Sequence, residues 1–595
     1  MSARAGVMVA AGLALVLGLA GITWGLPARW HPDEKADIAA EMARAPRLRP
    51  DSFINPSLPL YLMAPPLWLQ ARLAEAGVLR GRAADALLLG RALSALAGAA
   101  AVYVLGRAAL RAHGRLGALP AFLFALMPGA VNLCHFATPE AWLLLGTAAT
   151  LALALGHLRG DVPAWALGLV LGLTSSTKYT AAALLVPALA AVWLREPSPA
   201  SGRPRRRLLI AVAGALLVAG LVLTLGGAEP LAAGLHLKDA RLLHPEHALG
   251  FVRAVAHALL VAGLGLALLA ALAPRMPWAA RLAQDDVAVV IVAAAAGFLI
   301  GTPYALLDPQ GFLSDLAFNH QTRFEYKGLV GASTSYLAYV RLMRDALSGP
   351  FVVAAGAGAV VAAARAGAGD RAAAVVLAGL LAPYLLVASS GHQALRFLAP
   401  ALPAAAWLAA MALGALPSAT ARRAGTVLVL ARAALGSVLV VRLFFVDSRL
   451  AAQRWIEEHV PAGATVDLIA NNPGYAPALP PGRTLRVVPT LSREMAPADR
   501  FTEAAGRYPA EASPWLVLTA SYYERFLEHP DQQPERAAFF VDLLSGRDGF
   551  EVAARFRQHG WLRPPVEFVD PEIVVLLRKG ALAARPLEPP LAPRE

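Results

Sequence analysis

The sequence predicts an all-α polytopic membrane domain of about 13 transmembrane helices, followed by a small C-terminal α/β domain. Three observations predict this fold class. Hydrophobic residues make up 57% of the 595 residues and charged residues only 16%, and the mean hydropathy is +0.54. Apolar runs of membrane-spanning length recur over residues 1–446. From residue 447 to residue 595 the apolar runs are short and mixed with charged residues, as in a soluble domain.

A transmembrane helix needs roughly 20 apolar residues, because every backbone polar group must be satisfied within the bilayer. The first run is longer than the core of a signal peptide, and no cleavage site of small residues follows it, so we expect an uncleaved first span. The predicted spans lie near 6–27, 86–106, 117–134, 139–156, 163–176, 180–194, 208–227, 254–273, 287–305, 350–365, 372–389, 396–416 and 425–446.

The distribution of positive charge predicts a cytoplasmic N-terminus. Residues 447–595 hold 17 basic and 20 acidic residues, which leaves 36 basic and 20 acidic of the chain's 53 and 40 for residues 1–446. Arginines in short loops between apolar runs indicate the cytoplasmic side of a membrane rather than a nucleic-acid partner. An odd number of spans then places the C-terminal domain outside the cytoplasm. The predicted inside loops carry Arg107, Arg111, Arg115, Arg195, Arg203, Arg205, Arg206, Arg207, Arg275, Arg281, Arg365, Arg371, Arg422 and Arg423.

A proline-rich apolar stretch lies between Asn55 and Arg82. It is apolar enough to span a membrane, but we expect its prolines to break it repeatedly. A span here would also move the Arg107–Arg115 cluster to the outside. We therefore expect amphipathic juxtamembrane helices that lie in the membrane interface.

The C-terminal region has the pattern of a small α/β domain. A helix is predicted over 449–460 and a second over 521–528, and strands over 465–470, 515–519 and 573–577. The last dozen residues are rich in proline and are expected to be disordered. The single cysteine, Cys134, permits no intrachain disulfide. We expect this domain to be a structural cap or a contact for an acceptor.

The acids Asp33 and Glu34 directly follow the first span, next to His31 and behind Pro32. Acid pairs are common in solvated interfacial loops, and that remains one interpretation. The other is a general base at the membrane surface, able to take a proton from an attacking hydroxyl group. Glu140 stands at the start of a predicted span, where a carboxylate favours the helix dipole. It could instead be a second functional acid that binds an acceptor or helps to hold a divalent cation such as Mg or Mn.

Cations on the predicted outer side suggest a phosphate group. Arg396 begins a span, where a charge is costly unless it is paired, and a guanidinium matches phosphate geometry. Snorkelling toward lipid headgroups is the alternative. Lys178 and Tyr179, between two short spans, permit the same two interpretations. Weaker candidates for substrate binding on the outer loops are His31, His320, Arg323, Lys327 and His392.

Several nucleotide-binding motifs are absent from the sequence. There is no Asp-x-Asp, no Gly-x-Gly-x-x-Gly and no P-loop. A reaction that uses a nucleotide sugar or ATP is expected to leave one of these motifs. A donor on the outer face of the membrane is therefore expected to be carried by a lipid.

The segment Trp-His-Pro-Asp-Glu-Lys after the first span resembles the first extracytoplasmic loop of the GT-C superfamily of membrane glycosyltransferases. The branch it is most similar to contains bacterial relatives of protein O-mannosyltransferases and aminoarabinose transferases. Ala-Thr-Pro-Glu at 137–140, Thr-Lys-Tyr-Thr at 177–180 and Arg-Phe-Leu-Ala-Pro at 396–400 fit this resemblance. So do Asp-Ser-Arg-Leu at 447–450, Arg-Trp-Ile-Glu-Glu at 454–458 and Ser-Tyr-Tyr-Glu-Arg-Phe-Leu at 521–527.

The resemblance implies an enzyme of the bacterial inner membrane that works in the cell envelope. It implies a polyprenyl-phosphate sugar donor, inverting transfer and an extracytoplasmic acceptor that is a lipid, a glycan or a protein. By this match Asp33 is the base, Glu140 the second acid, and Lys178, Tyr179 and Arg396 lie near the carrier phosphate. Some relatives have a glutamate-lysine pair where this chain reads Phe53-Ile-Asn-Pro, so this chain has no acid or lysine there to contact a phosphate or a metal.

Two other function classes fit parts of the sequence. A transporter or lipid flippase would place polar groups near the bilayer midplane, often on broken helices in repeated halves. The short spans around Lys178 favour it, although the sequence has no convincing internal repeat. A non-catalytic scaffold that presents the C-terminal domain would not require the Asp-Glu loop.

Overall fold

The computed structural model describes residues 2–45, 48–196, 207–236, 243–276, 279, 285–322, 325–326, 329–330, 336–390, 394–470, 472–488, 513–557, 566 and 568–581. The chain divides into two compact units. The first comprises Met1–Ile22, Glu34–Phe324 and Gly331–Ser437, and the second comprises Thr23–Asp33, Glu325–Val330 and Val438–Glu595. The loop that ends at Asp33 therefore belongs to the same unit as the C-terminal sheet.

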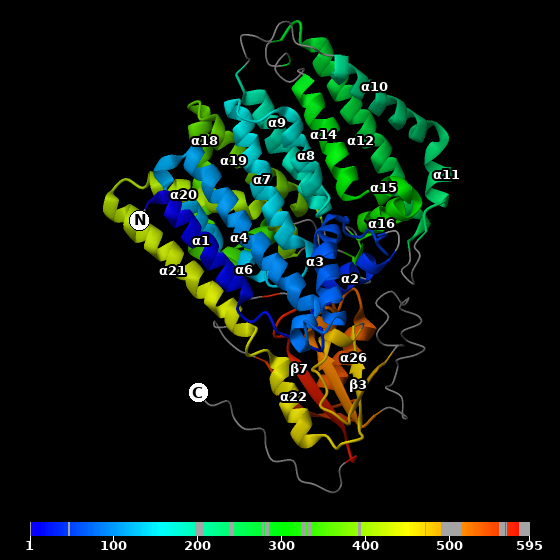
Figure 1. Ribbon diagram of the computed structural model, residues 1–595. Coiled ribbons are helices and arrows are strands. Elements are labelled where there is room, and N and C mark those ends of the chain that lie inside the picture. Colours follow the sequence, from blue (N-terminus) through cyan, green and yellow to red (C-terminus); the bar gives the residue numbers. More distant parts are fainter. Residues whose placement is uncertain are drawn as a thin grey trace. The chain divides into compact units, whose positions relative to one another are not determined.

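The first unit is a bundle of helices (Figure 1). Within the described residues, eight helices are long and apolar enough to cross a membrane, so the chain is a multi-pass membrane protein. These eight are Ala86–Ala112, Pro139–Arg159, Arg207–Ala233, Pro245–Leu272, Gly349–Gly367, Arg371–Ala388, Leu395–Ala415 and the helix that begins at Ala419. Shorter apolar helices are Ala3–Leu19, Ala164–Ser175 and Tyr179–Leu194.

Most predicted spans coincide with helices of this unit, but the first helix ends at Leu19 rather than near residue 27, and eight described helices, rather than about 13, have spanning length. In chain order the helices of this unit are α1 (Ala3–Leu19), α2 (Ala36–Arg44), α3 (Leu58–Glu75), η1 (Gly81–Ala84), α4 (Ala86–Ala112), η2 (Gly114–Leu116), α5 (Leu119–Ala125), α6 (Pro128–Leu133), α7 (Pro139–Arg159), α8 (Ala164–Ser175), η3 (Tyr179–Leu184), α9 (Leu185–Leu194), α10 (Arg207–Val222), η4 (Leu223–Gly227), α11 (Ala228–Ala233), α12 (Pro245–Leu272), α14 (Asp285–Gly301), α15 (Tyr304–Leu307), α16 (Pro309–Gln321), α17 (Tyr336–Leu347), α18 (Gly349–Gly367), α19 (Arg371–Ala388), η5 (Leu395–Ala401), α20 (Leu402–Ala415) and α21 (Ala419–Leu443).

Two expectations about helix breaks were wrong. The predicted span at 117–134 is two short helices, α5 and α6, and the second begins with Pro128 at its first position. Proline is favoured there because the first helical amide has no intrahelical partner. By contrast, α3 continues through Pro65 and Pro66, where we expected a break. Helix α3 packs against α2 and α4, and such tertiary contacts can outweigh intrinsic propensity.

Glycines permit a close contact between two helices of this unit. Helices α8 and α14 lie side by side (Figure 1). A Cβ atom at Gly172 would lie 2.0 Å from the carbonyl oxygen of Ala294, and one at Gly297 would lie 2.3 Å from that of Leu169. Small residues of this kind let helix backbones approach within a membrane, where packing rather than the hydrophobic effect drives association.

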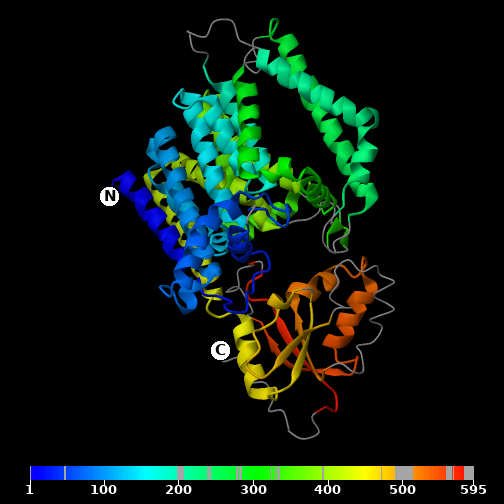
Figure 2. The ribbon, with the colours of Figure 1, turned by 45° about the vertical axis from the view of Figure 1, so that its right-hand side comes forward.

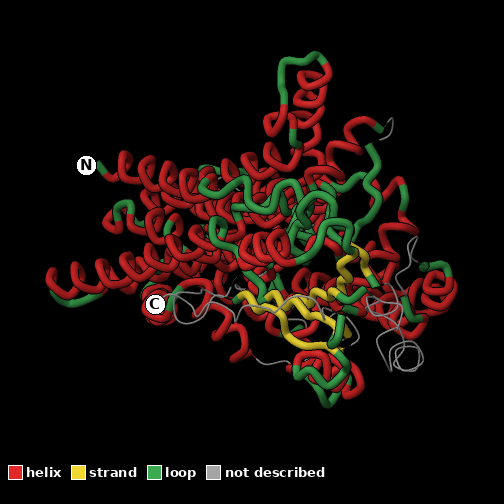
Figure 3. The backbone as a smooth tube through the Cα atoms, turned by 90° about the horizontal axis from the view of Figure 1, so that it is seen from below, coloured by secondary structure: helices red, strands yellow, loops and turns green. Residues whose placement is uncertain are grey.

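The second unit contains a five-stranded sheet of order β4-β3-β5-β7-β6, drawn in yellow in Figure 3. Strands β4, β3 and β5 are parallel, and β7 runs antiparallel to both β5 and β6. Figure 2 shows helices on both sides of these strands. The elements are α22 (Ser448–His459), β3 (Thr465–Ile469), η6 (Pro473–Tyr475), β4 (Thr484–Val487), β5 (Trp515–Thr519), α25 (Ala520–Glu528), α26 (Pro534–Leu544), β6 (Phe550–Phe556) and β7 (Ile573–Arg578), with the separate pair β1 (Glu325–Tyr326) and β2 (Leu329–Val330).

The predicted elements of this region are confirmed, and others were missed. The three predicted strands are β3, β5 and β7, and the two predicted helices are α22 and α25. Strands β5 and β7 are buried along almost their whole length, which explains their continuous apolar runs. Strands β4 and β6 alternate between more and less exposed residues, so their sequence signal is weaker. The expected disorder of the last dozen residues lies outside the described part of the chain.

Candidate functional site

Glu34 is held by a buried ion pair. Arg91, from α4, donates from Nε to Glu34 Oε1 over 2.7 Å and from Nη2 to Oε2 over 2.8 Å. The side chains are 1% and 4% exposed, respectively. Arg91 Nη1 also donates to the carbonyl oxygen of Ile22 over 2.8 Å. Both carboxylate oxygens of Glu34 are thus engaged within the first unit.

The same segment is tied to the loop that precedes α7. The amide of Ala137 donates to Glu34 Oε1 over 2.9 Å, and the amide of Lys35 donates to the carbonyl oxygen of Ala137 over 2.8 Å. Ala137 stands three residues before Glu140, and Asp33 directly precedes Glu34. The backbone just after Asp33 is therefore hydrogen-bonded to the loop that leads to Glu140.

Glu140 forms a buried ion pair with Lys178. Glu140 is in the first turn of α7, and Lys178 stands at the break between α8 and η3. The two residues are 4% and 7% exposed. A pair this deeply buried stabilises the fold only where its geometry offsets the loss of hydration. The pair therefore belongs to the interior of the bundle and is not an exposed surface ion pair.

Arg396 lies in the same group. It is in η5, which contacts both α7 and η3, and it interacts electrostatically with Glu140. Lys178 Nζ lies 5.2 Å and Arg396 Cζ lies 5.7 Å from the centre of the Phe397 ring. We call Glu140, Lys178, Arg396 and Phe397 the cation cluster. It holds two positive charges and one negative charge at the N-terminal ends of three helical segments, which also favour an anion.

Tyr179 anchors a different loop. Its hydroxyl group donates to the carbonyl oxygen of Phe53 over 2.7 Å, and its ring lies 6.4 Å from that of Phe312. Asp315, from α16, accepts from the Phe53 amide over 2.5 Å and from Ser52 Oγ over 3.1 Å. Asp315 and Tyr179 therefore hold the loop before α3 in place.

The weaker candidates are distributed over other parts of the chain. His31 is buried in the second unit, where its Nδ1 accepts from the Asp33 amide over 3.2 Å. His320 is in α16, with its ring 5.8 Å from that of Phe251 in α12. Arg323, Lys327 and His392 lie outside the described residues.

Within the described ranges, no three His, Cys, Asp or Glu side chains form a group suited to a metal ion. Glu140, the acid considered for a divalent cation, is paired with Lys178. A cavity of about 230 Å³ lies between α4 and α7, but it is lined by Arg107, Arg111 and Arg159 and by none of the predicted site residues. These arginines belong to the end of the helices that we predict to face the cytoplasm, so we do not assign the cavity to the candidate site.

The sequence contained one unused signal for this site. Arg91 lies within the predicted span 86–106, and a charge at membrane depth needs a partner. That rule, which singled out Arg396, applies equally to Arg91. No comparable signal identified Asp315, because an acid in a polar helix such as α16 is common on protein surfaces.

Residues 66–224 match the family model described as dolichyl-phosphate-mannose-protein mannosyltransferase. The match confirms the resemblance to GT-C membrane glycosyltransferases. No curated protein sequence matches the chain.

Two solved structures that match this chain are ArnT from Cupriavidus metallidurans bound to undecaprenyl phosphate and the archaeal oligosaccharyltransferase AglB from Archaeoglobus fulgidus in complex with an inhibitory peptide and a dolichol-phosphate. ArnT is 15% identical, with 97% of this chain and 99% of ArnT covered and a TM-score of 0.42. AglB is 13% identical, with 76% of this chain covered and a TM-score of 0.40. This chain spans 58% of the length of AglB.

Proposed function

We propose that this chain is an inverting glycosyltransferase of hexosyl or pentosyl type that moves a sugar from a polyprenyl-phosphate carrier to an extracytoplasmic lipid, glycan or protein. The observation that carries the proposal is the buried pair of Glu140 and Lys178, with the half-buried Arg396 beside the same Phe397 ring. The match of residues 66–224 to a dolichyl-phosphate-mannose-protein mannosyltransferase family supports it. We place the protein in a bacterial inner membrane, with its N-terminus in the cytoplasm.

The proposed chemistry uses one base and two cations. The acceptor hydroxyl attacks C1 of the sugar on the face opposite the phosphate, and Asp33 takes the hydroxyl proton. The bond between C1 and the phosphate oxygen breaks, and its electron pair stays on that oxygen. Lys178 and Arg396 stabilise the negative charge that develops on the departing polyprenyl phosphate. Attack from the opposite face inverts the configuration at C1.

The acids and the tyrosine have separate roles in this proposal. Glu34 has both oxygens engaged with Arg91, so it positions the segment after Asp33 rather than exchanging a proton. Glu140 holds Lys178 in place and keeps the net charge of the cation cluster at one positive unit. Tyr179 donates its hydroxyl to the Phe53 carbonyl and therefore acts near the carrier by ordering the loop before α3.

The transfer itself can be measured in detergent, where transport across a membrane has no meaning. The purified chain is mixed with a panel of radiolabelled sugars on undecaprenyl phosphate and with isolated bacterial envelopes as the acceptor. Asp33→Asn should lower the transfer rate at least about 100-fold, as expected for loss of a general base. Asp37→Asn, a nearby acid in the first turn of α2, is the control and should stay within threefold of wild type. A folded Asp33→Asn protein with full activity would remove the base from the proposal.

Binding of the carrier tests the cations separately. Undecaprenyl phosphate is the probe, and its affinity is measured in detergent by the shift in thermal unfolding. Arg396→Gln should weaken binding at least tenfold, because a charged contact to phosphate is lost. Arg371→Gln is the matched control, since Arg371 pairs with Glu196 at a more exposed position. Equal affinities for the two variants would contradict the role of Arg396.

A transporter or lipid flippase is the second candidate. The observation that favours it is the interrupted helix at Lys178, where a buried charge stands between two short apolar helices. Broken helices of this kind bind substrates in many transporters. Movement of the lipid carrier across the membrane of proteoliposomes, without sugar transfer in detergent, would favour this candidate over the transferase.

A further inference from the structure

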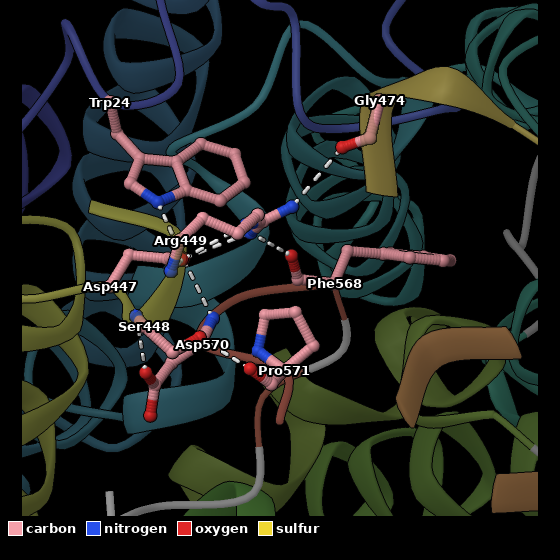
Figure 4. Close-up of polar contacts among 8 residues, drawn as sticks. All are labelled: Trp24, Asp447, Ser448, Arg449, Gly474, Phe568, Asp570 and Pro571. Atoms are coloured by element: carbon pink, nitrogen blue, oxygen red, sulfur yellow. Dashed lines mark hydrogen bonds and ion pairs between the residues drawn. The ribbon is translucent and has the colours of Figure 1, made fainter. Parts of the chain in front are cut away.

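The sequence Asp447-Ser-Arg-Leu, directly after the last membrane helix, has no part in the chemistry proposed above. Asp447 caps α22 by accepting from the amide of Arg449 over 2.9 Å. A cap needs only one carboxylate oxygen and no arginine. Here the cap belongs to a larger buried group that includes the loop before Asp33 (Figure 4).

Asp447 and Arg449 form an ion pair with no exposed side-chain surface. Arg449 Nε donates to Asp447 Oδ1 over 2.9 Å, and Nη2 donates to Oδ2 over 2.9 Å. Both side chains are 0% exposed. Asp447 Oδ2 also accepts from the amide of Asp570 over 2.8 Å and from the indole Nε1 of Trp24 over 3.0 Å. The carboxylate therefore joins the end of the membrane helix, the C-terminal strand region and the first loop.

The guanidinium group of Arg449 packs against two tryptophan rings of the same loop, which contact each other edge to face. Its Cζ lies 5.1 Å from the centre of the Trp24 ring and 4.5 Å from that of Trp30, both within cation–π range. It also donates to the carbonyl oxygens of Phe568, over 2.8 Å, and of Gly474, over 3.3 Å. Figure 4 shows the hydrogen bonds from Arg449 to Asp447, Gly474 and Phe568, which belong to three segments of the second unit.

The contacts continue along the loop to Asp33. The His31 ring lies 4.9 Å from that of Phe568, and His31 Nδ1 accepts from the Asp33 amide. A Cβ atom at Gly474 would lie 2.8 Å from the carbonyl oxygen of Arg29, so this glycine allows close packing against the loop backbone. Arg29 itself has a φ of 56°, a left-handed conformation that persists where its surroundings hold it.

We propose that the C-terminal unit positions the proposed base, with Asp447 and Arg449 as the residues that clamp the loop 23–33. This inference rests on the proposed function for the role of Asp33, but the clamp itself is a statement about the loop. A general base must be held within a few tenths of an ångström of its working position. The clamp would supply that constraint from a domain whose sequence suggested only a cap or an acceptor contact.

The test uses the full-length protein in detergent and two readouts. The first is amide hydrogen exchange of the segment 23–33, which requires no substrate. Arg449→Lys keeps the positive charge but loses the bidentate contact with Asp447. It should speed amide hydrogen exchange in the segment 23–33 at least tenfold. Arg449→Met should do the same and serves as the second variant. The matched control is Arg486→Met, which breaks another two-pronged ion pair in the same unit, between Arg486 and Asp467 on β4 and β3. It should leave exchange at 23–33 within twofold of wild type.

The second readout is sugar transfer and carrier binding. Arg449→Lys should lower turnover at least tenfold while the affinity for undecaprenyl phosphate stays within twofold, and Arg486→Met should change neither. Unchanged exchange at 23–33 in both Arg449 variants, or an equal increase in Arg486→Met, overturns the clamp. Absence of transfer by the wild-type protein overturns the proposed function instead, because the exchange result stands without it.

Discussion

The Glu34–Arg91 pair permits a quantitative test of how the first loop is held. Arg91 donates hydrogen bonds to both oxygens of Glu34 and to the Ile22 carbonyl. Arg91→Met fills a similar volume but removes these bonds, and it leaves a buried carboxylate that still accepts from the Ala137 amide. Breaking a buried pair by removing one partner typically costs about 3–5 kcal/mol. We expect a loss of this size in the free energy of unfolding.

The double variant separates the pair from its surroundings. Glu34→Gln combined with Arg91→Met leaves neither charge buried, so its loss should be smaller than the sum of the two single losses by about 2 kcal/mol or more. The free energies are measured by equilibrium unfolding of the detergent-solubilised chain in increasing SDS, followed by tryptophan fluorescence. Additive losses, or a loss below about 1 kcal/mol for Arg91→Met, would refute the reasoning, because both require an unpaired charge to be tolerated in the interior.

The same variants test the role assigned to Glu34. If Glu34 only positions the loop, the double variant should recover part of the transfer activity that Arg91→Met loses. If Glu34 exchanges the proton in the reaction, the double variant should be as inactive as Glu34→Gln alone. Activity and unfolding are measured on the same preparations, so a loss of folded protein is not mistaken for a loss of chemistry.

Three further predictions concern single residues. Tyr179→Phe removes the hydroxyl that donates to the Phe53 carbonyl and should cost about 1–3 kcal/mol of unfolding free energy. More than threefold weaker binding of undecaprenyl phosphate by this variant would show instead that the hydroxyl contacts the carrier. Asp315→Asn weakens the two bonds that hold the same loop and should cost about 1–2 kcal/mol, with no loss expected for the exposed control Asp161→Asn. Burial lowers the pKa of His135 to about 4, so the unfolded chain binds the proton first as pH falls below about 6.5. The free energy of unfolding should therefore decline by up to about 3 kcal/mol between pH 6.5 and 4. His135→Asn should show a shallower decline in thermal unfolding measured over that range, and identical slopes for the two proteins would contradict this cause.

The membrane class, the positions of the helices and much of the C-terminal sheet could be predicted from the sequence. Apolar runs of sufficient length and strands with continuous apolar residues are local signals, because transfer from water to an apolar environment depends on each side chain in turn. The same local reasoning failed at Pro65 and Pro66, where α3 continues, and at 117–134, where Pro128 starts a new helix. In both places the neighbouring helices or the position of the proline within the helix, rather than the residue type alone, decided the outcome.

The sequence also singled out the charged residues, but only the tertiary structure decided which of them meet. It pairs Glu140 with Lys178 and places Arg396 beside the Phe397 ring that Lys178 also contacts. It also pairs Glu34 with Arg91, which lies inside a predicted span and was not among the predicted site residues. It joins Asp447 and Arg449 to Trp24, more than 400 positions earlier in the chain. A buried charge requires a partner wherever the fold can supply one. The sequence states that requirement, whereas the identity of the partner depends on contacts between distant segments that exist only after packing.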